Sequence, residues 1–250
     1  LINPELEFPE AYMRNEIVIE NGSLKDFLME LIKNLGREEI SQQSFLSKKL
    51  YGLWRFLSNF NFQSRSKKNV EYHYDIGGEK GEKLYDIFLD KDYRQYSCAY
   101  WKENTKTLEE AQKNKINHII KKLDIKKNQK VLDIGCGWGG LVFEIAKNTG
   151  CEVTGISLST NQTNYCKNKA KELGLENQVN FKLLDYRDLN EKYDRIVSVG
   201  FAEHLGLKFY KTFFKKINAT LNKDGIFLLH MIGVVDKPSP PNLFINKYIL

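Results

Sequence analysis

A glycine-rich turn after a short apolar run is the part of the sequence whose residue types and spacing point most directly to chemistry. Residues 131–140 read Val-Leu-Asp-Ile-Gly-Cys-Gly-Trp-Gly-Gly, so that Asp133 precedes Gly135, Gly137 and Gly139. Glycine lets the backbone turn tightly and come close to a ligand. The helix expected next directs its free N–H groups and the positive end of its dipole to the same place. The pattern predicts a nucleotide-type site at the carboxyl end of a buried parallel strand.

Two ligand classes fit this turn. Its glycine spacing matches the dinucleotide fingerprint G-x-G-x-x-G, which requires an acidic residue about 20 positions later, at the end of the second strand. The second strand is expected at 152–157, and its end offers only the hydroxyls of Ser157 and Ser159. Asp133, two residues ahead of the first glycine, can face the ammonium group of a methionine moiety. Both features favour S-adenosylmethionine, and a turn that binds nothing is the plain alternative.

Around this turn the sequence alternates between apolar runs and amphipathic helices. Such alternation implies a doubly wound, Rossmann-like parallel sheet of the α/β class, with right-handed crossovers. Together with a turn that favours S-adenosylmethionine, this alternation leads us to expect the sheet of a class I methyltransferase with a helical N-terminal extension. We expect strands at 131–135, 152–157, 179–185, 194–199 and 225–231. We expect helices between them at 140–148, 160–173 and 207–221.

The region before the sheet is expected to be mostly helical. Ser23-Leu-Lys-Asp26 and Thr107-Leu-Glu-Glu110 are capping boxes, which satisfy the free N–H groups at a helix start. The helices predicted here cover 23–35, 44–57, 84–89 and 107–123, with a polar linker at 63–69. We therefore divide the chain into a helical N-terminal region, 1–70, and a methyltransferase domain, 71–250. The chain stops within an apolar segment, and a methyltransferase sheet usually has two more strands, so we expect its C-terminal strands to be missing.

Composition limits the partners that this protein can have. Of the 250 residues, 42% are hydrophobic, which is ordinary for a globular protein with a core, and no apolar run is long enough for a membrane span. The four cysteines show no metal or disulfide spacing, which favours a reducing cytoplasm and no metal. The net charge of +6 permits attraction to anionic phospholipid. Nucleic acid is not expected, because no nucleic-acid motif accompanies the charge.

Four further motifs accompany the glycine-rich turn. They are Tyr96-Ser-Cys-Ala-Tyr-Trp101, Asp185-Tyr-Arg-Asp-Leu189, Glu203-His-Leu-Gly206 and Leu228-Leu-His-Met-Ile-Gly233. With that turn, they resemble the cyclopropane-fatty-acyl-phospholipid synthase family, which includes the mycolic acid cyclopropane synthases. The resemblance runs from about Tyr72 to Leu250 and is looser over the N-terminal region. It implies transfer of the S-adenosylmethionine methyl group to a cis double bond of an unsaturated phospholipid acyl chain. The resulting cation loses a proton, and a cyclopropane ring closes.

The resemblance also implies a location and a catalytic group. It places the protein in the cytoplasm, on the inner face of the membrane, and leaves a homodimer open. A bound bicarbonate would act as base, held by Cys98, Glu203, His230 and the backbone of Ile232. Glu203 would accept a hydrogen bond from bicarbonate, whereas His230 and the Ile232 N–H would donate. Aromatic side chains would stabilise the cation and help to exclude water. Those available are Tyr96, Tyr100, Trp101, Tyr186 and Phe201.

The cofactor contacts implied by the resemblance come from four segments. The methionine end of the cofactor would lie near Tyr96 and Ser97, and the loop would be formed by Asp133, Gly135, Gly137 and Gly139. The ribose would be faced by Ser157, Leu158 and Gln162. The adenine would be flanked by Tyr186 and Arg187. Further active-site residues of the family, a tyrosine near the bicarbonate and a cysteine, lie beyond Leu250. We therefore expect these 250 residues to bind the cofactor weakly and not to turn over.

Other interpretations remain open. Cys98 could be a buried filler, His230 a satisfied core histidine, and Glu203 an acid in the first turn of a helix. The same fold and cofactor could also serve methylation of a small amine or phosphobase, or simple methylation of an alkene. A non-catalytic cofactor-binding fragment is the remaining alternative.

Overall fold

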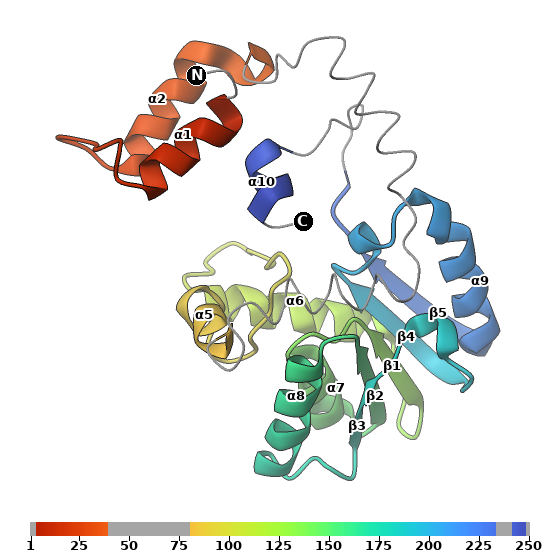
Figure 1. Cartoon of the computed structure of the whole chain (residues 1–250). Helices are drawn as coiled ribbons and strands as arrows, with labels where there is room; N and C mark the ends of the chain where they lie inside the picture. Colours follow the sequence, from red (N-terminus) through yellow and green to blue (C-terminus); the bar gives the residue numbers. More distant parts are fainter. Residues whose placement is uncertain (1–3, 40–80, 234–241, 249–250) are drawn as a thin grey trace. The chain divides into compact units, whose positions relative to one another are not determined.

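The computed structural model of this chain describes residues 4–39, 81–233 and 242–248. These residues fall into two compact units (Figure 1). Residues 81–233 form the larger unit, and residues 4–39 with 242–248 form the smaller one. The predicted boundary at residue 70 lies outside the described residues, so the division into domains stays a prediction.

The larger unit is built on a parallel sheet of five strands in the order β3-β2-β1-β4-β5. The strands are β1 (Lys130–Ile134), β2 (Glu152–Ser157), β3 (Val179–Leu183), β4 (Tyr193–Val199) and β5 (Leu221–His230). Every pairing is parallel, so all carboxyl ends lie at one edge. The chain runs outward from β1 to β3 and then returns to β4 on the other side of β1. This reversal creates a switch point at the carboxyl end of β1, where such sheets bind ligands.

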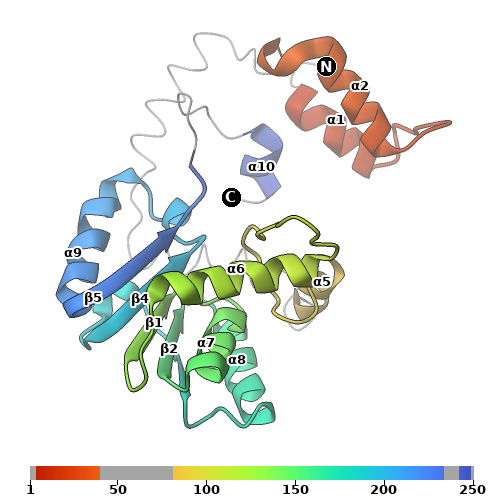
Figure 2. The same ribbon diagram turned by 180° about the vertical axis from the view of Figure 1, so that it is seen from behind.

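Side chains of the central strand alternate between two cores, one on each face of the sheet. Val131 packs in the core beneath α6 (Leu108–Leu123), α7 (Gly140–Thr149) and α8 (Thr160–Glu172). Leu132 and Ile134 pack in the core beneath α9 (Tyr210–Thr220). Figure 2 shows α6, α7 and α8 from the side opposite to Figure 1. The predicted doubly wound α/β fold is thereby confirmed.

The helices begin and end where the sequence provides caps. Thr107 accepts a hydrogen bond of 3.2 Å from the N–H of Glu110 at the start of α6. Ser159 accepts one of 3.2 Å from the N–H of Gln162 at the start of α8. Helix α7 lies between Gly139 and Gly150, both left-handed at φ +81° and +68°. Left-handed backbone favours glycine, so the two residues fix the length of α7.

Three predicted elements of the sheet region differ from the structure. The helix predicted at 207–221 is a 3₁₀ turn at Leu207–Phe209 followed by α9, and Leu221 already belongs to β5. Strand β5 thus begins four residues before its predicted start at 225, because its register shifts between Tyr193 and Arg195 of β4. Asp224, at φ +63°, lies within this irregularity. The strand predicted to reach 185 ends at Leu183, where a 3₁₀ turn at 186–188 begins soon after.

The smaller unit contains α1 (Pro4–Met13), α2 (Leu24–Glu39) and α10 (Leu243–Tyr248). Ser23 and Asp26 bond reciprocally at the start of α2, as the capping box predicts, and α2 continues past the predicted end at 35. Glu10 of α1 accepts hydrogen bonds from Lys247 at 2.6 Å and Tyr248 at 2.8 Å. Helix α1 was not predicted. The helix expected at 44–57 and the linker at 63–69 lie outside the described residues.

The larger unit also contains α5 (Gly81–Phe88), which matches the short helix predicted at 84–89 apart from an earlier start. None of the helices in the described part of the chain is both long and apolar enough to cross a membrane.

Candidate functional site

The glycine-rich loop leaves the carboxyl end of β1 in a tightly fixed shape. The N–H groups of Gly135 and Cys136 both donate to the carbonyl of Ile156 on β2, at 3.0 and 3.1 Å. A Cβ atom on Gly135 would lie 2.9 Å from the Phe201 ring, and Gly135 has φ +80°. Gly137 also has a positive φ, and a Cβ there would meet no atom of the described residues within 4 Å. The loop therefore requires glycine at 135 and leaves open space at Gly137.

Asp133 lies on β1 just before this loop and is 2% exposed. Burial raises the pKa of its carboxyl to about 7, and the positive charge of Lys115 acts in the opposite direction. With this pKa, the carboxyl group is partly protonated at neutral pH. A cation placed beside it would favour the ionised form.

The end of β2 carries polar side chains in place of a carboxylate. Ser157 donates a hydrogen bond of 2.9 Å from its hydroxyl to the side-chain carbonyl of Gln162, and the Ser159 N–H donates to the Ser157 hydroxyl at 3.1 Å. Ser157 and Gln162 are both buried, and Leu158 between them in sequence is half-buried. The structure thus brings the predicted ribose-facing residues together at the edge next to the glycine loop.

The residues predicted beside the adenine follow β3. The Tyr186 ring is buried against Phe201, with ring centroids 5.8 Å apart, and against Phe213 at 5.2 Å. Arg187 donates to both carboxylate oxygens of Asp185, at 2.9 and 2.6 Å. This pairing raises the pKa of Arg187 further above its usual range. Tyr186 therefore contributes its ring to the core beneath α9.

The aromatic segment Tyr96–Trp101 lies against α6 and reaches the end of β4. A Cβ atom on Gly200, the residue after β4, would lie 3.6 Å from the Cβ of Ser97. The Tyr100 N–H donates to the carbonyl of Ala111 on α6 at 3.1 Å. Cys98 and the large rings of the segment, those of Tyr96, Tyr100 and Trp101, are exposed.

The sequence did not identify two residues that hold this segment. Gln112 and Lys115 of α6 are buried and donate hydrogen bonds to Ser97, at 3.0 and 2.7 Å. Lys115 belongs to a lysine-rich stretch, 113–130, in which lysines on solvent-exposed helix faces are the usual expectation. Its place beside Ile116 and Ile119, on the inward apolar face of the helix, is the signal that could have distinguished it.

Three of the four residues predicted to hold bicarbonate meet where β4 and β5 end. Glu203 lies in a 3₁₀ turn after β4, and its Oε1 accepts a hydrogen bond of 2.8 Å from the Ile232 N–H. His230 is the last residue of β5 and pairs with Val199. Its Nδ1 atom is buried and has no hydrogen-bond partner in the described part of the chain. Cys98, the fourth, is exposed and adjoins Ser97.

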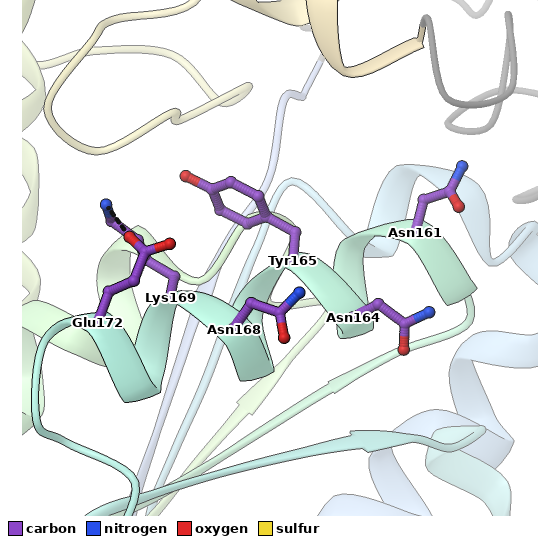
Figure 3. A pocket seen from close by; sticks show the side chains of 6 residues that line it. All are labelled: Asn161, Asn164, Tyr165, Asn168, Lys169 and Glu172. Carbon is purple, nitrogen blue, oxygen red and sulfur yellow. Dashed lines mark hydrogen bonds and ion pairs between the residues drawn. The ribbon is translucent and has the colours of Figure 1, made fainter.

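A hollow on the outer face of α8 is separate from these residues. Figure 3 shows its lining side chains projecting from one helix, with Lys169 paired to Glu172 at 2.8 Å. The lining residues are Asn161, Asn164, Tyr165, Asn168, Lys169 and Glu172. None of the predicted site residues lines this hollow. Those described above lie at the carboxyl edge of the sheet, and this edge is the candidate site.

Comparisons with known proteins agree with this geometry. A sequence profile described as mycolic acid cyclopropane synthetase matches residues 62–250. Cyclopropane-fatty-acyl-phospholipid synthase of Escherichia coli (strain K12) is 42% identical over 192 residues, covering 76% of this chain and 48% of that protein. The cyclopropane synthase MmaA2 from Mycobacterium tuberculosis superposes with a TM-score of 0.62 at 34% identity, covering 66% of this chain and 56% of that one.

A second solved structure, the mycolic acid cyclopropane synthase CmaA1 complexed with SAH and CTAB, matches with a TM-score of 0.61 at 34% identity, covering 65% of this chain and 55% of that one. The chain spans about half the length of the curated relatives that it matches. The profile match covers well over half of the chain, and it includes β1 to β5 with every predicted site residue. The chain belongs to the mycolic acid cyclopropane synthetase family, whose members have the class I methyltransferase fold described above.

Proposed function

We propose that this chain supplies the S-adenosylmethionine-binding part of an enzyme that forms cyclopropane rings on unsaturated phospholipid acyl chains. The observation that carries the proposal is the contact between Glu203 and the Ile232 N–H, at 2.8 Å, two residues after His230, whose buried Nδ1 has no hydrogen-bond partner among the described residues. A carboxylate, a backbone donor and an imidazole thus share one corner of a methyltransferase sheet. The names of the relatives in this family support the same reaction class.

The glycine loop fits S-adenosylmethionine in charge and in shape. The cofactor supplies a methyl group on a positively charged sulfur, and it also carries an ammonium group. Asp133, whose pKa burial raises to about 7, would be held ionised by that ammonium. Open space at Gly137 would admit a ligand close to the backbone. Ser157 and Gln162 would offer a hydroxyl and an amide to the ribose.

The corner at β4 and β5 fits a small anion that can both donate and accept hydrogen bonds. Bicarbonate would supply a proton acceptor there. Glu203 would accept from its hydroxyl and the Ile232 N–H would donate to it. Nδ1 of His230, which has no partner among the described residues, would gain one. A buried polar atom without a hydrogen-bond partner destabilises the folded protein, so a hydrogen bond from His230 to this anion would be stabilising.

The exposed aromatic segment would serve the lipid. Tyr96, Tyr100 and Trp101 present ring surface beside Ser97 and near the end of β4. Aromatic faces attract a developing cation, and they keep out the water that would trap it. A net charge of +6 would favour binding to the anionic face of a membrane, and this is the location that we propose for the enzyme.

Lipid mass spectrometry tests the proposal. The complete gene that encodes this chain is expressed in cells that lack a cyclopropane synthase, in its natural form and as Glu203→Gln. Glu176→Gln, at an exposed position on the same unit, is the matched control. The natural and control proteins should add one CH₂ to unsaturated acyl chains, whereas Glu203→Gln should not. Unchanged acyl chains with the natural protein would contradict the proposal.

A second candidate is methylation of a small amine. Coclaurine N-methyltransferase bound to N-methylheliamine and SAH matches with a TM-score of 0.56 at 26% identity, covering 82% of this chain and 63% of that one. The exposed aromatic side chains could enclose an amine equally well. The two candidates differ in where the mass of the CH₂ is found. An amine or head group gains it in this case, and the acyl chain stays unchanged.

A further inference from the structure

Helix α6 directs two buried polar side chains, one turn apart, toward the segment that carries Ser97. Gln112 donates from Nε2 to the carbonyl of Ser97 at 3.0 Å. Lys115 donates from Nζ to the hydroxyl of Ser97 at 2.7 Å and lies 3.5 Å from its carbonyl. The lysine is only 4% exposed. Lysine is almost never buried to this degree unless it is paired, so this position requires an explanation.

Three groups that can carry negative charge lie near enough to Lys115 to favour its charged form. They are Asp90 from the loop after α5, Cys98 from the aromatic segment and Asp133 from β1, and each favours the charged lysine. Burial acts against them and lowers the pKa of Lys115 to about 8. Asp90 also accepts hydrogen bonds from the N–H groups of Tyr93 and Gln95, at 2.6 and 2.8 Å. Lys115 is the charged group that opposes the upward pKa shift of Asp133.

We propose that Lys115 is a positioning residue of the cofactor site, an inference that rests on the proposed function for the identity of the ligand. Its ammonium holds the hydroxyl of Ser97 and compensates the carboxylate of Asp133. Two predicted cofactor-binding residues, from separate segments of the chain, are thereby set relative to each other by one side chain. The single ammonium lies near two buried carboxylates, those of Asp90 and Asp133. Because the ammonium of Lys115 favours the ionised form of Asp133, its loss would leave that carboxyl more readily protonated and less able to attract the ammonium group of the ligand.

The test compares Lys115→Met with Lys113→Met, which changes an exposed lysine on the same helix. S-adenosylhomocysteine binding to the full chain is measured by calorimetry from about pH 6 to pH 9. Lys115→Met should bind about tenfold more weakly or worse at neutral pH, and Lys113→Met should bind normally. The natural chain should lose affinity as the pH rises through the pKa of Lys115, about 8. The amine of the ligand titrates in the same way in all three measurements. The difference between the pH profiles of the natural chain and Lys115→Met therefore reports the titration of Lys115.

The outcomes separate this role from the cofactor site itself. Equal affinity and the same pH profile for Lys115→Met and the natural chain would overturn the role of Lys115 while leaving the site in place. Absence of binding by the natural chain, at every pH, would overturn both. If Lys115→Met does not fold, Lys115→Gln keeps a donor for the Ser97 hydroxyl without the charge. Lys115→Gln must also lack the decrease in affinity between about pH 7 and pH 9 that titration of Lys115 causes. A variant that keeps this decrease would contradict the proposal.

Discussion

The backbone N–H of Ile232 donates a hydrogen bond of 2.8 Å to Oε1 of Glu203. The two residues are contributed by different parts of the chain, since Glu203 follows β4 and Ile232 follows β5. Pairing of β4 with β5, with Val199 opposite His230, brings them to one corner of the sheet. The bond also means that the N–H is already aligned with a carboxylate. A ligand anion would accept from this N–H only by sharing it with Glu203 or by displacing Glu203 from it, while the carboxylate could accept a hydrogen bond from the ligand.

Glu203→Gln is expected to abolish ring formation while S-adenosylhomocysteine binding changes little. The amide is similar in size and can still accept from the Ile232 N–H, but it has lost the negative charge. Binding by calorimetry and product by lipid mass spectrometry measure the two effects on the same protein. A variant that keeps full activity would show that the carboxylate has no part in the reaction.

Gly139→Ala should destabilise the larger unit more than Gly150→Ala does. Both glycines adopt left-handed backbone, at φ +81° and +68°, so both substitutions introduce strain of about 1–3 kcal/mol. At Gly139 the new Cβ would also lie 2.9 Å from the Cys166 sulfur, whereas at Gly150 it would meet nothing within 4 Å. Urea unfolding of the two variants measures the difference. Equal losses of unfolding free energy would show that the contact with Cys166 relaxes easily.

Asp133→Asn should flatten the dependence of stability on pH between about pH 4 and pH 7. The folded-state pKa of Asp133 is raised from 3.8 to about 7, so the folded state holds this proton more strongly than the unfolded state does. Its contribution is complete below pH 3.8 and is lost as the pH rises toward 7. The change amounts to at most about 4 kcal/mol. Urea unfolding of the variant and of the natural chain at several pH values provides the measurement. If the two free energies of unfolding depend on pH in the same way, the raised pKa of Asp133 is wrong.

Arg94→Ala should weaken the attachment of α5 and its following loop to the glycine loop. The Arg94 guanidinium lies 4.4 Å from the centroid of the Trp138 ring and 4.6 Å from that of Tyr165. It also forms an ion pair of 2.8 Å with Asp86. Loss of these contacts should lower the free energy of unfolding by about 1–3 kcal/mol. Lys91→Ala, at an exposed position in the same loop, is the control, and an equal effect of the two would argue against the ring contacts.

The sequence was most informative where local patterns and burial agree. Apolar runs predicted the five strands, and the capping box at Thr107 predicted a helix start where the structure has one. The start of β5 was mispredicted because the irregular pairing around Asp224 depends on β4, which a local pattern does not reveal. Lys115 was missed for a related reason. A lysine in a lysine-rich stretch is expected to be exposed to solvent. Only the packing of α6 against the aromatic segment places the ammonium of Lys115 beside Ser97.

The motifs that carry the candidate site residues could be identified from the sequence, while the contacts of these side chains could not. Glu203 and Ile232 were expected to hold the same anion, and the structure pairs them directly. Tyr186 was expected beside the adenine, and its ring is packed against Phe201 and Phe213. Such details depend on side-chain packing between segments distant in the sequence, whereas the motifs themselves are local. Their roles in binding and catalysis stay predictions until the variants above are measured.

The shared carbonyl of Ile156 has a consequence for how the glycine loop moves. Because it accepts from both Gly135 and Cys136, the first turn of the loop is held by a neighbouring strand. The amide protons of these two residues should exchange with solvent as slowly as those of the sheet interior, despite the three glycines that follow β1. A ligand would then meet a loop already in its final shape. Little conformational entropy would be lost on binding, and affinity would depend on contacts alone.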